Sequence, residues 1–195
     1  MIHKVLHDLL LELGGDDLVR RISRRAGVEL ADIRIVDYQS DEEFRALLAI
    51  VLEESGLDRS AMMQSYADHF LAYAEGLFPQ FFAMSENTRA FLIRQPRIHS
   101  TLGAGLRSDR DRLEVRNKFT VIECDDGTLE VEYRSVAALC DLYRTLARSL
   151  AARYEEQVFV SVMNCGAGSG CRLKLMFTPP EATVELVRCT WSPAS

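Results

Sequence analysis

The sequence predicts an α+β domain in which a helical N-terminal half packs on an antiparallel sheet carrying one long helix. Through roughly the first hundred residues, apolar side chains recur at spacings of three and four, which is the period of amphipathic helices. From Lys118 onward the spacing changes to two, which is the period of strands with one buried face. A run of helices followed by a run of strands is typical of the α+β class.

Capping residues and glycines divide the helical half. Ser40 and Glu43 have the spacing of a capping box, which predicts that a helix begins there. A later helix runs through 62–73, and Pro96 is expected to open the short helix that carries His99. The glycines expected to end helices are Gly14, Gly15, Gly27 and Gly56.

The second half begins with a hairpin. The Asp-Asp-Gly sequence at 125–127 separates two alternating segments and predicts the turn between them. Ser135 is the expected N-cap of a long helix over 136–154. Two further strands, 158–163 and 172–177, are expected on either side of a loop over 164–171.

Length and charge limit the classes of protein to consider. The 195 residues suit one domain, 1–195, with a mainly helical part over 1–110 and the sheet with its long helix over 111–195. The net charge of −6 argues against nucleic acid as a partner, because phosphate binding needs a concentrated basic surface. No stretch reaches the roughly 20 apolar residues of a membrane span, and the start lacks the pattern of a signal peptide. We therefore expect a cytoplasmic protein with no membrane contact.

Catalytic patterns do not emerge from the sequence. The glycine-rich stretch 166–170 lacks both the lysine and the strand-to-helix setting of a phosphate-binding loop. No Ser/His/Asp or Cys/His set is apparent, and the helical carboxylates are most simply explained as a solvated face. The sequence therefore predicts a binding domain and not an enzyme.

A histidine and a pair of hydroxyl residues form the most informative motif. The segment 91–99, Phe-Leu-Ile-Arg-Gln-Pro-Arg-Ile-His, ends at His99, and Tyr133-x-Ser135 follows where a strand gives way to a helix. With its neighbouring segments, the chain resembles the H-NOX (HNOB) family of haem-based nitric oxide and oxygen sensors along nearly its whole length. The other segments that match the family in order are Ala26-Gly27, 41–43 and 66–82.

The resemblance implies a b-type haem whose iron is bound by His99. It also implies that Tyr133 and Ser135 donate hydrogen bonds to the haem propionates. The third propionate-binding position is an arginine in the family and is Ala137 here, and the proline that distorts the porphyrin in the family has no counterpart in 108–113. The arginines considered as substitutes are Arg94, Arg97 and Arg144.

The resemblance also bears on the gas and on the output. Oxygen-binding members carry a distal tyrosine on the long helix where this chain has Leu142, and Tyr143 is expected to be turned away by about 100°. The expected ligand is therefore nitric oxide or carbon monoxide, and not oxygen. A sensor of this kind signals to a separate protein, such as a histidine kinase or a cyclic-dinucleotide enzyme.

The cysteines form a second candidate site. An odd number of cysteines in a domain of ordinary size is read as thiols or metal ligands before disulfides. Some bacterial H-NOX proteins hold zinc near the positions of Cys140, Cys165 and Cys171, and Cys189, Asn164 or water would then complete four ligands. A thiol redox switch and simple packing of small apolar side chains are the alternatives.

Simpler interpretations stay open for the other motif. His99 can be an ordinary surface histidine, Tyr133 a core residue of a strand and Ser135 only a helix cap. The chain can equally be a haem-free H-NOX-like module that binds another hydrophobic ligand or a protein, or that senses redox state through its cysteines. The remaining histidines, His3, His7 and His69, are expected to be solvated or packed.

Overall fold

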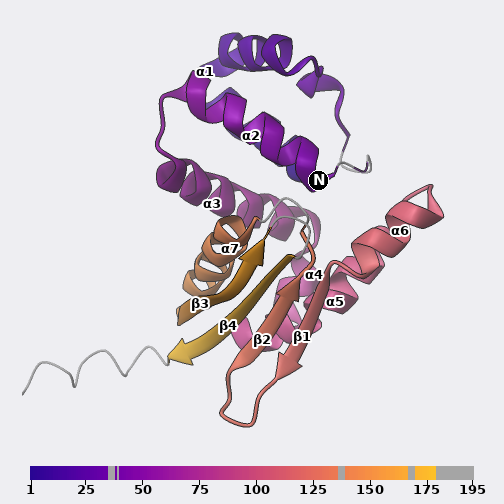
Figure 1. Cartoon of the computed structure of the whole chain (residues 1–195), viewed down its shortest axis with the longest axis vertical. Helices are drawn as coiled ribbons and strands as arrows, with labels where there is room; N and C mark the ends of the chain where they lie inside the picture. The colour runs from indigo at the N-terminus through magenta and orange to yellow at the C-terminus, as the bar shows by residue number, and fades with distance from the viewer. Residues whose placement is uncertain (35–37, 39, 136–138, 167–169, 179–195) are drawn as a thin grey trace, which may run out of the picture.

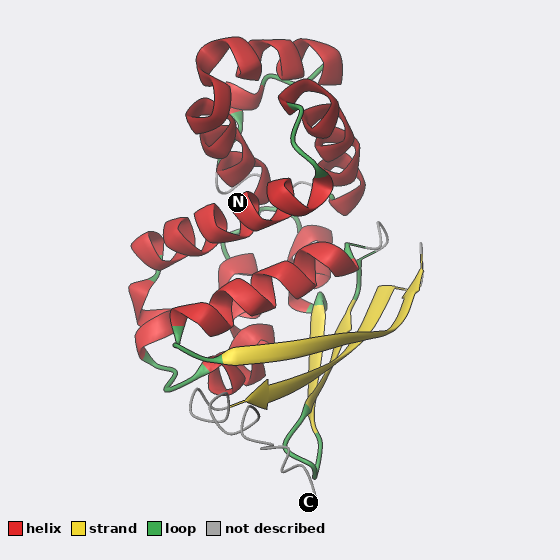
Figure 2. Cartoon of the chain, turned by 90° about the vertical axis from the view of Figure 1, so that its left-hand side faces the viewer, coloured by secondary structure: helices red, strands yellow, loops and turns green. Residues whose placement is uncertain are grey.

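The computed structural model describes residues 1–34, 38, 40–135, 139–166 and 170–178 (Figure 1). A helical part lies at one end of the molecule, and a four-stranded antiparallel sheet with its helices lies at the other (Figures 1 and 2). The predicted α+β class is confirmed. One apolar core runs through both parts, from Leu10 and Phe44 in the helices to Leu173 in the sheet.

Two glycines divide the first helical segment. α1 spans Ile2–Ala26, but Gly14 and Gly15 have non-helical backbone angles inside it and separate two helices that meet at a kink. The prediction that these glycines end the first helix is therefore confirmed. Gly27 does end α1, with φ of 66° in the left-handed region that favours glycine.

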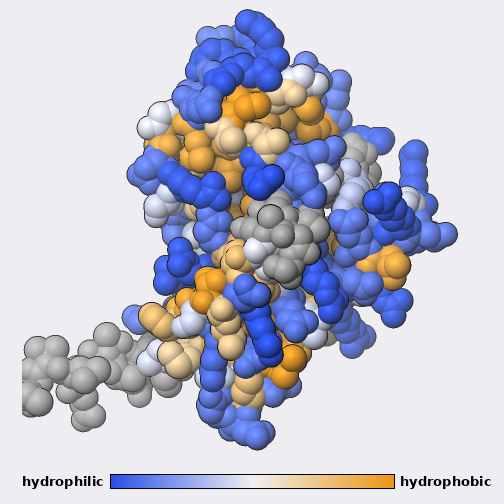
Figure 3. Space-filling model, in the orientation of Figure 1, coloured by the Kyte–Doolittle hydropathy of each residue, from blue (hydrophilic) through white to orange (hydrophobic). Residues whose placement is uncertain are grey.

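The capping box at Ser40 is confirmed. The Ser40 hydroxyl accepts a hydrogen bond from the backbone N–H of Glu43, and the Glu43 carboxylate accepts one from the backbone N–H of Ser40. α2 spans Asp41–Ser55, after the short 3-10 helix η1 at Leu30–Asp32. Gly56 ends α2, and Asp58 caps α3 at Arg59–Leu77. On the face shown in Figure 3, apolar residues gather between the helices of this part.

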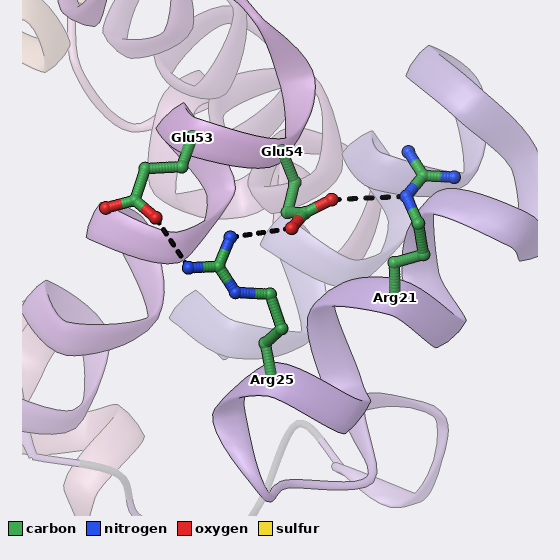
Figure 4. Close-up of polar contacts among 4 residues, drawn as sticks. All are labelled: Arg21, Arg25, Glu53 and Glu54. Atoms are coloured by element: carbon green, nitrogen blue, oxygen red, sulfur yellow. Dashed lines mark hydrogen bonds and ion pairs between the residues drawn. The ribbon is translucent and has the colours of Figure 1, made fainter.

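Charged pairs join the second half of α1 to the end of α2 (Figure 4). Arg25 donates hydrogen bonds to both Glu53 and Glu54, each at 2.6 Å, and Arg21 donates to Glu54 at 3.2 Å. The arginines are exposed, so water and salt weaken these pairs. Exposed pairs of this kind contribute little to the stability of the fold.

The helix that carries His99 differs from its prediction. α4 spans Pro79–Ala83, α5 spans Thr88–Gly103 and α6 spans Asp109–Arg116. Pro96 lies inside α5 and does not open it, since Asn87 provides the N-cap. A proline there lacks the N–H that would bond one turn back, and α5 tolerates this loss within 16 residues of helix. The helical part also ends at Arg116, beyond the predicted boundary at 110.

The sheet has the strand order β1-β2-β4-β3, and all its pairs are antiparallel. β1 (Phe119–Glu123) and β2 (Leu129–Tyr133) form the predicted hairpin. β3 (Gln157–Gly166) and β4 (Gly170–Thr178) are longer than predicted, so most of the expected 164–171 loop is paired strand. Cys165 and Cys171 lie opposite each other in this pair.

The helix after β2 begins later than predicted. α7 spans Cys140–Arg153 and packs on both α3 and β3. Its N-cap is Leu139 with no side-chain cap, so the prediction that Ser135 caps it is wrong. α1, α3 and α5 are each longer than α7. Within the described part of the chain, no helix is long and apolar enough to cross a membrane.

The backbone at the start of β4 requires a glycine at position 170, and stability measurements can test this requirement. Gly170 has φ of 75°, and a Cβ there would lie 2.7 Å from the Tyr133 carbonyl oxygen. Gly170→Ala should therefore lower the free energy of unfolding by about 2–4 kcal/mol, from strained backbone and overpacking together. Urea denaturation followed by circular dichroism measures this loss.

Gly127→Ala is the matched control. Gly127 has a similar φ of 78°, but no atom lies within 4 Å of the Cβ that alanine would add. The free energy of unfolding of this control should fall by only about 1 kcal/mol, the cost of placing alanine in the left-handed backbone conformation. Equal losses in the two variants would contradict the close approach of β4 to Tyr133.

Candidate functional site

His99 lies on α5 against the start of the sheet. Its imidazole is 4.6 Å from the Phe119 ring, measured between ring centroids, with the planes inclined at 58°. Its neighbour Ile98 is buried, and His99 itself is half-buried. His99 therefore has one face against the ring of Phe119 and part of its surface open.

Four side chains form what we call the ring cluster: His99, Phe119, Tyr133 and Tyr143. They come from α5, β1, β2 and α7, respectively. Phe119 and Tyr133 are opposite each other in the β1–β2 register, and their rings stack 4.9 Å apart at an angle of 10°. The Tyr143 ring lies 5.6 Å from both. Elements that are distant in the sequence therefore meet at one histidine.

Tyr143 points into this cluster, contrary to the expected orientation. Its hydroxyl donates a hydrogen bond of 3.0 Å to the Gln95 side-chain oxygen, one helical turn before His99 on α5. Leu142 is buried as well. Consecutive helix residues point about 100° apart. Leu142 and Tyr143 are nevertheless both buried, because α7 packs on α3 with one face and on β3 with another.

Burial controls the protonation of the cluster. The pKa of His99 falls to about 4, first because burial disfavours the charged imidazole and then because of the positive charge of Lys118. Burial raises the pKa of both Tyr133 and Tyr143 above the usual tyrosine range. Near neutral pH the site therefore presents an uncharged imidazole and two protonated phenols.

A buried ion pair adjoins the cluster. Lys118 Nζ donates a hydrogen bond of 2.7 Å to Asp41 Oδ2, and the two side chains are 16% and 5% exposed. Lys118 Nζ also lies 6.0 Å from the centroid of the Tyr133 ring. Sequence reasoning missed this pair, because Asp41 looked like a helix-start residue and Lys118 like the polar end of a strand.

Ser135 is buried without a bonded hydroxyl. Its residue is 0% exposed, and its Oγ has no hydrogen-bond partner in the described part of the chain. Although burial has the larger effect and raises the pKa of Tyr133, the Tyr133 hydroxyl is close enough to Ser135 for an interaction between the two side chains to lower that pKa in part. The two hydroxyls therefore lie together at the edge of the ring cluster. The neighbouring Ala137, where the family has arginine, lies outside the described residues.

The three arginines considered as substitutes have different environments. Arg94 donates to the Phe81 carbonyl and to Ser85 Oγ, and Arg97 is exposed. Arg144 lies next to Tyr143, and its buried Nε has no partner among the described residues. The structure therefore gives none of the three a contact with Tyr133 or Ser135.

The remaining histidines are packed or paired, as expected. His3 is buried edge-on against Phe44, with a ring separation of 5.6 Å. His7 is buried beside Asp8, and His69 lies 3.5 Å from Glu12. His3 thus belongs to the core of the helical part.

The donor chemistry of the ring cluster fits a haem. Iron takes a neutral imidazole nitrogen, and His99 is neutral near pH 7. The buried Ser135 hydroxyl and the Lys118 ammonium suit carboxylate acceptors. No porphyrin fits between these rings as they stand, because a flat ring needs contacts of about 3.5 Å on each face, whereas the rings are 4.6–5.6 Å apart. A porphyrin would therefore lie beside the cluster or displace one of its rings.

Three cysteines converge beside the strand that carries Tyr133. The sulfurs of Cys140, Cys165 and Cys171 lie within 4.8 Å of one another. Cys165 and Cys171 are paired across β3 and β4 with sulfurs 3.1 Å apart, and Cys140 is the first residue of α7. The Cys140 sulfur lies close to both of the others. A metal ion or one disulfide with a thiol would satisfy this arrangement.

No fourth metal ligand accompanies these cysteines in the described residues. Asn164 lies in a shallow hollow of about 250 Å³ that Cys171 also lines. Cys189 lies outside the described residues, and Cys124 is a free cysteine on the β1–β2 side of the sheet.

Comparison with known proteins agrees with the fold and the motif. The family model described as haem-NO-binding (HNOB) matches residues 1–162. A search of curated proteins finds no match. One similar solved structure comes from work on haem distortion in the H-NOX family, with a TM-score of 0.71, 19% identity and coverage of 92% of this chain and 94% of that one.

Two other solved structures illustrate the same likeness. An oxygen-binding H-NOX domain related to soluble guanylate cyclases has a TM-score of 0.68 and 18% identity, covering 90% of this chain and 93% of that one. An H-NOX protein from S. oneidensis in the Fe(II)NO ligation state has a TM-score of 0.73 and 11% identity, covering 91% and 98%. At such identities these structures establish the fold alone, whereas the family model covers most of the chain. The chain belongs to the haem-NO-binding, or H-NOX, family.

Proposed function

We propose that this chain is a haem-based gas sensor in which His99 binds the iron of one b-type haem. The observation that supports this most directly is the neutral, desolvated imidazole of His99 inside the ring cluster. Such a group is unusual on a protein surface and is the form in which histidine binds metals. The chain belongs to the H-NOX family, and His99 stands where the family motif has its iron-binding histidine. Both points support the assignment of His99 as the iron ligand.

The other site residues have supporting roles. When bound, the haem supplies a ferrous iron that takes up a diatomic gas. Tyr133 and Ser135, whose hydroxyls lie together, donate hydrogen bonds to propionate carboxylates. Partial burial against the aromatic rings and the nearby positive charge of Lys118 favour the uncharged form of His99.

The gas in this proposal is nitric oxide, with carbon monoxide as a second ligand. Leu142 offers no hydroxyl, and the Tyr143 hydroxyl is engaged by Gln95. Bound oxygen needs a hydrogen-bond donor to persist, whereas nitric oxide binds ferrous iron without one. Residues 1–195 act as one sensor domain and not as an enzyme, and a separate protein such as a histidine kinase or a cyclic-dinucleotide enzyme receives the signal.

A haem-free binding module of the same fold is the alternative function. The observation that favours it is the packing of Phe119 between His99 and Tyr133, which already fills the centre of the cluster. In this alternative the core is complete without a cofactor, and the cysteines sense the redox state.

The haem assignment predicts a histidine-dependent spectrum. The protein, reconstituted with haemin, should bind about one haem per chain and show a Soret band. His99→Gly should lose the band or show it only with added imidazole, because imidazole can occupy the space of the missing ring. His69→Gly, on α3 and outside the ring cluster, is the matched control and should bind haem like the original chain.

Two outcomes separate this proposal from its alternative. A chain that stays colourless after reconstitution would favour the haem-free module. A His99→Gly variant with an unchanged spectrum in the absence of imidazole would show that another residue binds the iron.

Gas selectivity is a further prediction. The reduced haem protein should form complexes with nitric oxide and with carbon monoxide, and it should form no stable oxygen complex. Leu142→Tyr should introduce oxygen binding if position 142 faces the gas, and Leu142→Phe controls for the larger ring without a hydroxyl. Absorption spectra under each gas measure the result, and a long-lived oxygen complex of the original chain would contradict it.

We also propose that Cys140, Cys165 and Cys171 hold a zinc ion. Their sulfurs are close enough to one another to meet a single ion, and two of the three cysteines are buried. Zinc prefers thiolate ligands in a tetrahedral set, so one more ligand must come from water or from residues outside the described part. Such a site would fasten the start of α7 to the β3–β4 pair.

Elemental analysis tests the zinc site. The purified chain should contain about one zinc per chain, and Cys140→Ser should lose it, whereas Cys124→Ser should keep it. A chelator should lower the melting temperature, because metal binding is coupled to folding. Metal-free protein in which the three thiols react independently would contradict the site, and an intact mass lower by two hydrogens would favour the redox alternative.

A further inference from the structure

The ion pair between Lys118 and Asp41 is unusually buried for a single lysine. Lysine is rarely buried unless it is paired, and here its side chain is 16% exposed. Taking two charges out of water costs free energy that their attraction repays only in part. A pair of this kind therefore calls for a role beyond stability.

The ammonium of Lys118 has unused bonding capacity. An ammonium carries three N–H donors, and Asp41 accepts the only hydrogen bond from Nζ to a described residue. The same ammonium lies 6.0 Å from the Tyr133 ring centroid, and Lys118 directly precedes Phe119. Lys118 is therefore a cation at the edge of the ring cluster that can accept a further anionic partner.

The haem of the proposed function would supply an anionic partner for Lys118. A haem carries two carboxylates on one edge, and this chain has Ala137 in place of the family's arginine. Arg94 is engaged by Phe81 and Ser85, so it is not available without breaking those bonds. Lys118 lies beside the Tyr133 ring, whereas Arg134, the residue after Tyr133, already donates to the Asn117 carbonyl and to Thr120 Oγ1.

We propose that the Lys118 ammonium binds a carboxylate of the porphyrin. When the porphyrin is absent, the Asp41 carboxylate binds the Lys118 ammonium instead. This inference rests on the proposed function, since it names the residue that recognises the carboxylate edge of the same ligand. The step is an exchange of one ionic partner for another and involves no covalent change.

The exchange has a structural consequence. Asp41 is the first residue of α2 in the helical part, whereas Lys118 lies between α6 and β1, at the start of the sheet. Their bond spans 77 positions of sequence and ties α2 to the sheet. When a ligand carboxylate takes Lys118, the start of α2 loses this tie, so occupation of the site is transmitted to the helical part.

Haemin and haemin dimethyl ester separate the carboxylate contribution from the rest. Both molecules carry the same iron and ring, but the ester has no anionic edge. Soret titration of the full chain should show tighter binding of haemin than of its ester. Lys118→Met should weaken haemin binding about tenfold, as expected for a lost charge-assisted hydrogen bond, and should leave the ester unchanged.

Removal of the competitor should have the opposite effect. Asp41→Asn should tighten haemin binding severalfold and leave the ester unchanged, because Lys118 is then free before the ligand arrives. The double variant Asp41→Asn/Lys118→Met removes both buried charges together, which avoids an unpaired charge if one single variant fails to fold. It should lose the part of the preference for haemin over the ester that Lys118 contributes and keep the part that Tyr133 and Ser135 contribute.

The pair formed by Lys174 and Asp126 provides the matched controls. It has the same residue types and a similar bond of 2.9 Å, but it joins β4 to the β1–β2 turn on the surface. Lys174→Met and Asp126→Asn should leave both affinities unchanged, and circular dichroism should show that all variants are folded.

The contrary outcomes are distinct. If the original chain binds haemin and its ester equally, or if Lys118→Met changes neither affinity, the role of Lys118 is overturned while the haem proposal stands. If the original chain binds neither molecule, the proposed function fails and this inference fails with it.

Discussion

The burial of four rings at the junction of α5, α7, β1 and β2 is the constraint on which this structure depends. His99, Phe119, Tyr133 and Tyr143 can meet only if the β1–β2 register pairs residue 119 with 133 and α7 turns its Tyr143 face toward α5. Large aromatic side chains bury much apolar area, so this contact fixes the relative positions of elements that are distant in the sequence. It also desolvates the one histidine that the proposed function requires.

Polar contacts around the cluster are few and directional. The Tyr143 hydroxyl bonds Gln95 on α5, and Lys118 bonds Asp41 on α2. Each joins elements far apart in the chain and lies beside an apolar core, where an unpaired polar group is costly. By contrast, the exposed pairs of Arg21 and Arg25 with Glu53 and Glu54 lie in water and act on α1 and α2 only. The polar contacts at the junction are therefore those that can respond to a ligand.

The cysteine site has a different physical origin. Cys165 and Cys171 face each other because β3 and β4 are paired through that region, and the φ of 75° at Gly170 lets β4 begin against the Tyr133 carbonyl. The same glycine therefore brings the ring cluster and the cysteine cluster near one another, since Tyr133 is paired with Cys171 in the sheet. A change of metal or redox state at the cysteines would act on the strand that carries Tyr133.

The sequence by itself determined the fold class, the capping box at Ser40, the hairpin at 125–127 and the family, because local periodicity and short motifs carry that information. Its errors were local as well: Pro96 is tolerated inside α5, and α7 begins at Cys140 and not after Ser135. Intrinsic helix preferences, about 3 kcal/mol for a proline and under about 1 kcal/mol for most residues, are small enough for packing to outweigh them at such positions.

Only the tertiary structure decided which side chains meet. Tyr143 was expected to turn away, yet packing of α7 on two sides buries it against Phe119. The pairing of Lys118 with Asp41 has no signature in sequence spacing, because a long-range contact depends on how the helical part and the sheet join. The residue types of the site were thus visible in the sequence, while their partners, burial and charge states arose from the packing of the two parts against each other.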